Sequence, residues 1–311
     1  MRVPRVTPAF LRRLTTLNVV LLLAVVVSGA IVRLSNSGLG CRDWPNCSTT
    51  QFVSVATDHA AIEQINRIFS GLIGIPLALT LYAVYRMRPR RSDLVVRAWM
   101  LVGLFLCEAV VGGLSVQLQL AWFSVMSHFL LALALVSVAL QVRQRVREPA
   151  GRRMPIVRPE AMWLVRVVYV WTIGVLILGT LVTAAGPHGG DRDAKRLAIP
   201  ITDLARTHAV AVDLLVILTL VTAIVLVRTR APRAVLSTVS FAIAAMVAQG
   251  VLGYVQYAEA VPAVLAGFHV FGAVLVFAAV QQLALSTTAP TVQRPEGLVV
   301  HRPDLPQPVG S

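Results

Sequence analysis

Three histidines lie inside long apolar segments of this chain, where a polar side chain is costly and usually functional. His208 and His269 each follow the start of such a segment by a few residues, and His128 lies in a third. Two histidines on facing helices suit the axial ligation of a b-type haem. The alternative is that both rings bond to helix backbones, and the separation of the pair along the chain does not decide between the two.

The second half of the chain repeats the first. Two pairs of segments match across the halves: 108–113 with 249–254, and 29–33 with 179–183. His128 follows Glu108 by the same number of residues as His269 follows Gln249. With four apolar segments in each half, both halves enter the membrane from the same side, so equivalent residues lie at equal depth.

The repeat also exposes a difference between the halves. The residue equivalent to His208 is Asn66, and an amide is a poor ligand for haem iron. The second half therefore predicts a complete pair of histidines, whereas the first half predicts an open site that suits a bound substrate. His59 is an alternative second ligand if its helix begins early.

Glu63 shares one helix face with His59 and Asn66. This spacing predicts a carboxylate near the outer end of the second helix, aimed at the cavity of the first half. The alternative is a carboxylate that extends to the membrane interface or forms an ion pair, for example with Arg67.

Two of the three cysteines lie in the loop after the first apolar segment. Cys41 and Cys47 would face an oxidising compartment there, which permits a disulfide, either as a structural link or as a redox-active pair. We interpret Cys107, inside the third segment, as a small packing residue.

The elements that must position these residues are membrane helices. The chain has 311 residues, of which 57% are hydrophobic and 14% charged, and its mean hydropathy is +0.75. A bilayer core of about 30 Å needs roughly 20 apolar residues per helix. We expect eight helices, at residues 14–34, 60–85, 95–118, 123–142, 161–184, 203–227, 234–257 and 262–285. The first segment lacks a clean cleavage pattern, so we interpret it as a retained helix.

The predicted fold class is an all-α integral membrane protein with two parallel, pseudo-symmetric four-helix bundles. We expect an N-terminal half at 1–148, a C-terminal half at 149–288 and a disordered tail at 289–311. Arginine clusters precede the first helix and follow the second, fourth and sixth. The positive-inside rule then places these clusters and both termini in the cytoplasm. The net charge of +14 is spread over these linkers, which argues against nucleic-acid binding.

Two segments, 29–47 (GAIVRLSNSGLGCRDWPNC) and 179–191 (GTLVTAAGPHGGD), resemble the haem A synthase family. The tandem halves and the three membrane histidines fit this family as well, and the resemblance covers about residues 14–285. It implies an oxidoreductase of the bacterial cell membrane that oxidises the C8 methyl of haem O to a formyl group. The product, haem A, would serve terminal oxidases.

The resemblance also implies roles for individual residues. A haem b cofactor would lie between His208 and His269, and the substrate haem would lie near His128, with both sites toward the extracytoplasmic side. Glu63 would be catalytic, and the outer-loop cysteine pair of the family matches Cys41 and Cys47.

The chain departs from the family on the second helix. Many members have Glu-x-x-His-Arg there, whereas this chain has Asn66 before Arg67. Ligation of the substrate by His128 alone, by His59 or by water is then left open. Arg67 and Arg33 are candidate partners of haem propionates, although Arg33 could instead reach the membrane interface.

Two other classes compete with this interpretation. A di-haem electron-transfer reductase would share the histidine pair but would not need Glu63. A parallel-repeat transporter would use the histidines for protons or substrate. The sequence leaves the electron acceptor and the oligomeric state open, with haem O synthase and a second copy of the chain as candidate partners.

Overall fold

The computed structural model of this chain describes residues 6–291. Eight helices are long and apolar enough to cross a membrane, which confirms the predicted fold class of eight spans. They are α1 (Pro8–Leu34), α2 (Asp58–Arg86), α3 (Ser92–Gln117), α4 (Trp122–Arg147), α5 (Pro159–Ala185), α6 (Ile201–Arg228), α7 (Arg233–Ala258) and α8 (Ala263–Ser286).

The predicted ends are closest where a turn stops the helix and least accurate where charged residues continue it. α1 begins at Pro8 and not at Leu14, because Thr7 caps the helix and accepts a hydrogen bond from the Phe10 amide at 3.2 Å. α4 likewise continues past Val142 through an arginine-rich last turn. Hydropathy locates the apolar core of a helix but not its polar extension.

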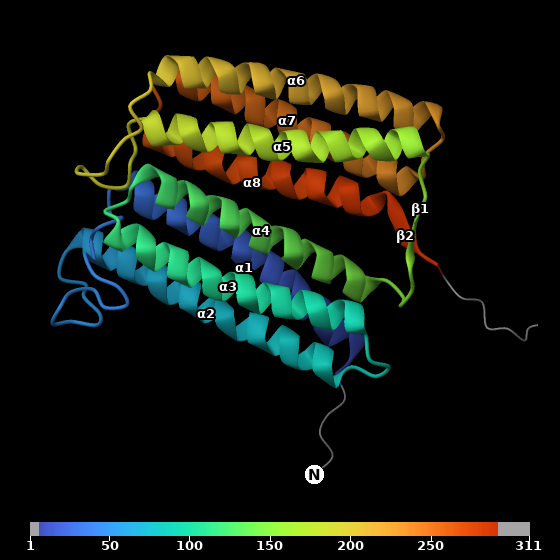
Figure 1. The fold of residues 1–311 in the computed structure, drawn as a ribbon, viewed down its shortest axis with the longest axis horizontal. Coiled ribbons are helices and arrows are strands. Elements are labelled where there is room, and N and C mark those ends of the chain that lie inside the picture. Colours follow the sequence, from blue (N-terminus) through green and yellow to red (C-terminus); the bar gives the residue numbers. More distant parts are fainter. Residues whose placement is uncertain (1–5, 292–311) are drawn as a thin grey trace, which may run out of the picture.

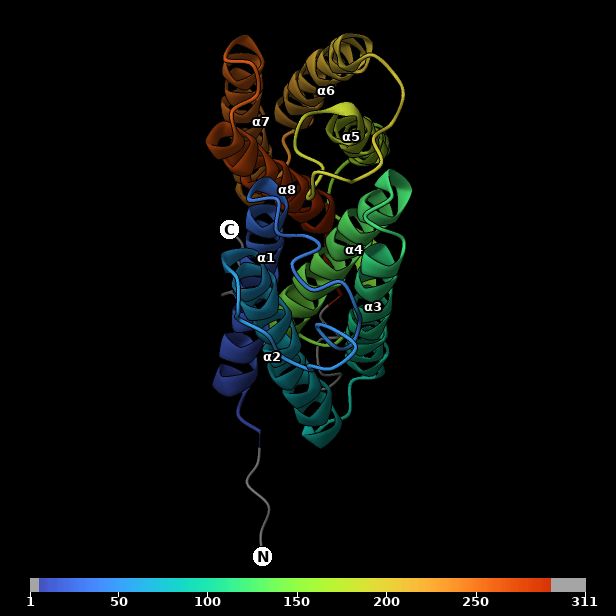
Figure 2. The ribbon, with the colours of Figure 1, turned by 90° about the vertical axis from the view of Figure 1, so that its left-hand side faces the viewer.

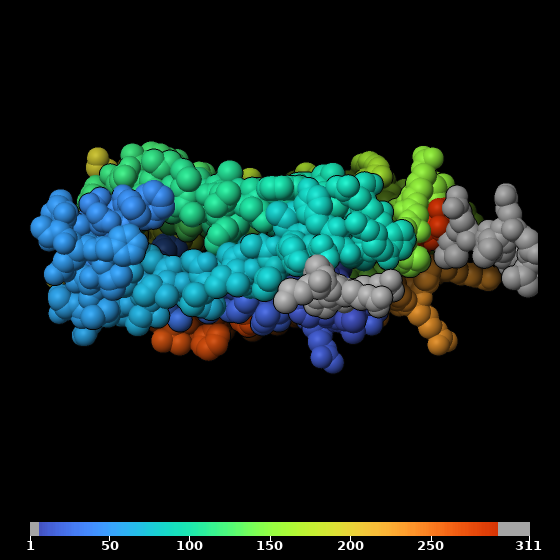
Figure 3. Space-filling view, turned by 90° about the horizontal axis from the view of Figure 1, so that it is seen from below, coloured from blue at the N-terminus to red at the C-terminus, as the bar shows by residue number. Residues whose placement is uncertain are grey.

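The helices form two neighbouring groups. α1–α4 pack around one another, as do α5–α8, and α8 joins the groups by also packing against α1 and α4 (Figures 1 and 2). The α1–α2 and α5–α6 loops emerge at the same end of the molecule, at the left of Figure 1. Seen from below, the first group presents α2 and α3 along its length, with the α1–α2 loop in blue at one end (Figure 3).

The interior and the outer faces of the helices are both apolar. Buried leucines and valines, such as Leu22, Leu77 and Val136, fill the interior of the first group. Large apolar residues, such as Ile65, Val210 and Val251, remain exposed on the helix surfaces. Because no charged outer face hides these residues from solvent, the arrangement suits a protein surrounded by acyl chains.

A polar seam crosses the contact between α4 and α8. Ser137 donates to the Gln281 amide oxygen at 2.8 Å, and Gln282 donates to that of Gln144 at 2.9 Å. Such interhelical bonds hold membrane helices together because lipid offers the same groups no partner.

Two short strands correct the purely helical expectation. β1 (Arg153–Pro155) pairs antiparallel with β2 (Thr288–Pro290), and Arg153 bonds to Thr288 and Glu148. Strands this short leave no recognisable alternation in the sequence. The predicted disordered tail therefore begins too early, since residues 289 and 290 are in β2. Residues 292–311 lie outside the described part.

Candidate functional site

The same packing recurs at all three membrane histidines. Each ring lies against a glycine of a neighbouring helix, where an added Cβ atom would come within 3.0 or 3.1 Å of the ring Cε1 atom. The pairs are Gly112 with His128, Gly179 with His208, and Gly253 with His269. A larger residue at any of these glycines would have to displace the ring, so the glycines fix where the imidazoles lie.

The two nitrogens of each ring have different surroundings. Nδ1 of His128, His208 and His269 is buried and has no hydrogen-bond partner among the described residues. Nε2 of each ring, in contrast, is not a buried atom without a partner. Each histidine thus keeps one accessible nitrogen that could bind iron.

The fourth position of the repeat holds no ring. The Asn66 amide oxygen accepts a hydrogen bond from Ser28 of α1 at 2.7 Å. Gly29, the equivalent of Gly179, has no atom within 4 Å of where its Cβ would lie. The position beside Gly29 is therefore open at the point where the other three sites carry an imidazole.

Glu63 is locked in place by Arg67 and by the loop between α1 and α2. The side chain of Glu63 is buried, and its Oε2 accepts from the Cys41 amide at 2.8 Å. Its Oε1 accepts from Arg67 Nε at 3.1 Å and from Nη2 at 2.6 Å. The structure therefore shows the ion pair with Arg67 that the sequence offered as an alternative.

Arg67 extends this lock across the loop. Its guanidinium donates to the backbone carbonyls of Cys41, Asp43 and Asn46 at 3.0–3.3 Å. The disulfide between Cys41 and Cys47 closes the same loop, as the sequence predicted. One buried ion pair and one disulfide thus give this loop a defined shape.

The loop covers the first group of helices near His128. The indole of Trp44 packs on Gly113 of α3, next to Gly112, which carries the His128 ring. Figure 2 shows the loop, in blue, extending from α1 and α2 toward α3 and α4. Glu63 and Arg67 are thus connected to His128 by a chain of contacts. They bind the loop, Trp44 of the loop packs on Gly113, and the neighbouring Gly112 contacts the His128 ring.

His59 and Arg33 are held by other contacts. His59 Nδ1 lies 2.9 Å from the Ser37 hydroxyl in the first turn of α2. Arg33 Nη2 donates to the Thr183 carbonyl at 3.1 Å and to that of His188. Arg33 therefore joins the end of α1 to the end of α5, a role that neither sequence interpretation of this residue anticipated.

The remaining loops at the same end of the molecule are also joined to one another. His188 Nε2 lies 2.8 Å from the Val261 carbonyl, and Arg196 donates to the carbonyls of Gly186 and Pro187. Burial lowers the pKa of Arg196 from its ordinary value, because its guanidinium exchanges water for peptide groups. These contacts depend on tertiary structure and left no signal in the spacing.

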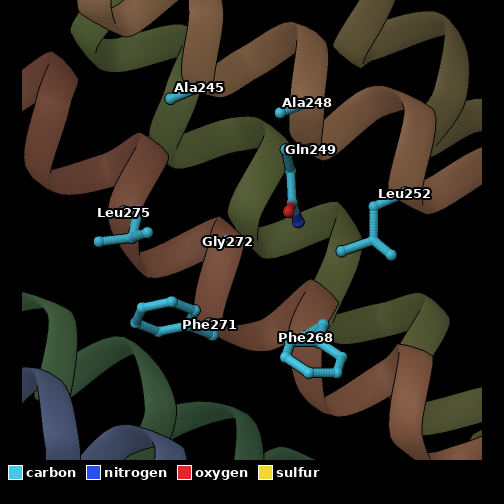
Figure 4. A pocket seen from close by; sticks show the side chains of 8 residues that line it. All are labelled: Ala245, Ala248, Gln249, Leu252, Phe268, Phe271, Gly272 and Leu275. Carbon is cyan, nitrogen blue, oxygen red and sulfur yellow. The ribbon is translucent and has the colours of Figure 1, made fainter.

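A cavity of about 310 Å³ lies between α7 and α8 (Figure 4). Its wall is apolar apart from Gln249, and includes Phe268 and Phe271. Gln249 Nε2 donates to the backbone carbonyl of His269 at 2.7 Å, so this cavity adjoins the helix turn that carries the histidine.

Two further residues differ from their sequence interpretation. Cys107, which we expected to be a small packing residue, is exposed on α3. Glu108 served only to align the repeat, yet its Oε1 lies 3.2 Å from Nδ1 of His128. An acidic residue within a membrane segment was the signal that could have found it.

Among the described residues, no three His, Cys, Asp or Glu side chains come together as a metal-ion site. A haem needs only one or two protein ligands, because the porphyrin supplies the other four. The accessible Nε2 atoms therefore fit haem better than a protein-bound metal ion.

Comparison with known proteins identifies the family. Residues 12–187 match the family model of COX15-CtaA, described as cytochrome oxidase assembly protein, over more than half of the chain. The chain belongs to the COX15-CtaA family. The matched residues include the Glu63–Arg67 ion pair and His128, and they end before His208 and His269.

Named relatives of this COX15-CtaA protein are called "Heme A synthase". The protein from Shewanella oneidensis is 30% identical over 153 residues, which is 43% of this chain and 45% of the relative. The protein from Bacillus licheniformis is 25% identical over 180 residues, 57% and 58% of the two chains. The aligned regions thus span about half the length of these relatives.

Proposed function

We propose that this COX15-CtaA protein is a haem A synthase, which oxidises the C8 methyl of haem O to a formyl group. The observation that carries the proposal is the recurrence of one arrangement at three histidines. Each has an accessible Nε2 atom at membrane depth and a ring fixed against a glycine. The names of the relatives support the same activity.

We assign residues 149–288 to a haem b cofactor and residues 1–148 to the substrate. His208 and His269 would hold the cofactor through Nε2. The glycines that contact them, Gly179 and Gly253, would set the orientation of the imidazole rings. When bound, haem b would supply an iron centre that accepts and passes on single electrons. The residues present fit this group, because both imidazoles lie against a glycine and keep an Nε2 atom that is not buried.

In the substrate half, His128 would bind the iron of haem O through Nε2. The open position beside Gly29 leaves the opposite side of that iron without a histidine, which suits a molecule that must enter and leave. A single strong ligand holds a substrate less permanently than a pair.

We assign the acidic role in catalysis to Glu63. Its negative charge would stabilise positive charge that develops near the reacting methyl, or receive a proton from it. Arg67 keeps this carboxylate in one orientation through two hydrogen bonds. Arg33 and Arg67 are our candidates for the haem propionates, and each would exchange a backbone carbonyl for a carboxylate on binding.

We also propose a location and partners for the protein. Arginine clusters indicate cytoplasmic termini in the bacterial cell membrane, so the end with the Cys41–Cys47 disulfide would face outward, where disulfides persist. Haem O synthase as the source of substrate and a second copy of this chain are candidate partners.

The test uses the full chain in a bacterial host that makes haem O but lacks its own haem A synthase. We expect purified protein to show the visible spectrum of low-spin haem b, and cell extracts to contain haem A. His208→Ala and His269→Ala should lose the low-spin haem, whereas His128→Ala should keep it and lose haem A. His188→Ala, outside both sites, is the matched control.

Each competing class predicts a different result. A transporter would show no Soret band, which would overturn both haem interpretations. A di-haem reductase would bind haem but leave haem O unchanged in the extracts. Normal haem A production by Glu63→Gln would remove Glu63 from the catalytic scheme.

A further inference from the structure

Glu108 and Gln249 occupy equivalent positions of the repeat but serve the neighbouring histidine differently. Each lies one helical turn before the glycine that carries the ring, Gly112 or Gly253. Gln249 donates to the backbone carbonyl of His269 and makes no hydrogen bond to the ring. Glu108 instead directs Oε1 to the ring itself, 3.2 Å from Nδ1 of His128.

The second carboxylate oxygen of Glu108 and the facing nitrogen of His128 have no other partner within residues 6–291 to hold them. Glu108 Oε2 and His128 Nδ1 are both buried without a hydrogen-bond partner among the described residues. The Glu108 side chain is 16% exposed, and His128 is its only ion-pair neighbour in the described part of the chain. A carboxylate at membrane depth is costly, so its position beside a lone imidazole calls for a function.

The distance fits a hydrogen bond that a small rotation would complete. Donor–acceptor separations of 2.7–3.2 Å are usual for N–H···O bonds, and the Oε1–Nδ1 distance lies at the upper end of this range. A carboxylate that accepts from Nδ1–H keeps the proton on that nitrogen. It thereby leaves Nε2 with its lone pair and makes it a stronger ligand.

We propose that Glu108 is a positioning residue that fixes the tautomer of His128 and strengthens its bond to the iron of the substrate haem. The inference rests on the proposed function and deepens it. It also accounts for the difference between the halves. Where Asn66 removes the second histidine, the remaining one gains a carboxylate, whereas the complete pair in the second half has only the neutral Gln249.

The experiment compares Glu108→Gln, which keeps the shape but removes the charge, with Glu108→Asp, which keeps the charge. Gln249→Leu in the second half is the matched control. Purified full-length protein that retains its haem b is titrated with ferrous haem O. The readouts are the haem O dissociation constant and the resonance Raman iron–histidine stretching band of the five-coordinate site.

We expect Glu108→Gln to weaken haem O binding about 10–100-fold, as is typical of lost outer-shell carboxylates, and to lower the frequency of the iron–histidine band. Glu108→Asp should keep most of the wild-type haem O affinity and a band frequency close to that of the wild type. The low-spin haem b spectrum should not change in either variant. Gln249→Leu should leave the band where it is.

The experiment distinguishes a failure of this inference from a failure of the proposed function, because wild-type protein is titrated with haem O as well. If wild-type protein binds haem O but Glu108→Gln changes neither the affinity nor the Raman band, the inference alone is wrong. If wild-type protein binds no haem O, both are wrong. If Glu108→Gln fails to fold, the other variants decide. An iron–histidine band at the wild-type frequency in Glu108→Ala would contradict the role of the charge, and so would a band at lower frequency in Glu108→Asp.

Discussion

His269 of α8 rests on Gly253 of α7, so closely that a Cβ atom on Gly253 would lie 3.0 Å from the ring Cε1 atom. Gly250 lies on the same helix and has no atom within 4 Å of its own Cβ position. These two glycines, three residues apart, therefore differ in whether a histidine ring covers them.

Gly253→Ala should therefore weaken haem b binding, whereas Gly250→Ala should not. The added methyl group would push the His269 ring by a few tenths of an ångström out of line with the iron. We expect about tenfold weaker haem retention, at the lower end of the effect of lost outer-shell support. Gly250→Ala should stabilise α7 slightly, by about 0.5–1 kcal/mol. Haem content per protein after detergent washing measures the difference, and equal retention by the two variants would contradict a seating role.

The sequence placed the three histidines within membrane helices because two independent patterns carry them. Apolar length marks the membrane helices, and the repeat relates His128 to His269 without knowledge of any contact. The open position at Asn66 was visible for the same reason. Features that depend on an internal repeat or on a run of apolar residues can therefore be predicted from the sequence alone.

Contacts made by loops and by helix ends could not be predicted in this way. The backbone amide that binds Glu63 belongs to Cys41, across a loop whose path no local pattern describes. Arg33 contacts carbonyls near residue 183, in the other half of the chain. The Glu63–Cys41 hydrogen bond, the contact between the halves and the short β1–β2 pairing all depend on which segments meet after folding.

Arg67→Gln should loosen the α1–α2 loop. The substitution leaves Glu63 buried without its ion-pair partner and frees three backbone carbonyls. Breaking a buried pair from one side costs about 3–5 kcal/mol, and the side chain of Arg67 is 17% exposed, so we expect a loss near the lower value. Thermal unfolding measures the loss of stability. The rate of alkylation of Cys41 and Cys47 after mild reduction measures how far the loop has loosened. Arg42→Gln, exposed in the same loop, should change neither.

Asn66→His should complete the first histidine pair. The space beside Gly29 is open, and removal of the Asn66 amide releases Ser28, so an imidazole can take the place that His208 has in the second half. Visible and paramagnetic resonance spectra should then report a second low-spin haem, about as abundant as the first. Substrate should also exchange more slowly, because two axial ligands must dissociate.

A second variant tests whether the ring uses that space. Asn66→His combined with Gly29→Leu should return the first site to a single histidine ligand, because the leucine side chain fills the position of the ring. A second low-spin haem in the double variant would mean that the new histidine binds iron by another route.

Arg33→Gln should separate the two halves of the protein more easily. Arg33 donates to carbonyls at the end of α5 and in the following loop, and a hydrogen bond from a charged donor contributes about 1.5–3 kcal/mol. We expect a lower unfolding temperature in protein without haem, measured by scanning calorimetry in detergent. Arg192→Gln, exposed in the α5–α6 loop, is the control and should unfold like wild type.

The same variant separates the structural role of Arg33 from the propionate role that the sequence suggested. If Arg33 chiefly joins α1 to α5, Arg33→Gln lowers the unfolding temperature equally with and without haem, and haem affinity changes little. If it chiefly binds a propionate, haem-free protein unfolds like wild type and only the stabilisation by added haem is lost. Because these two outcomes move different measurements, one pair of melting curves decides between them.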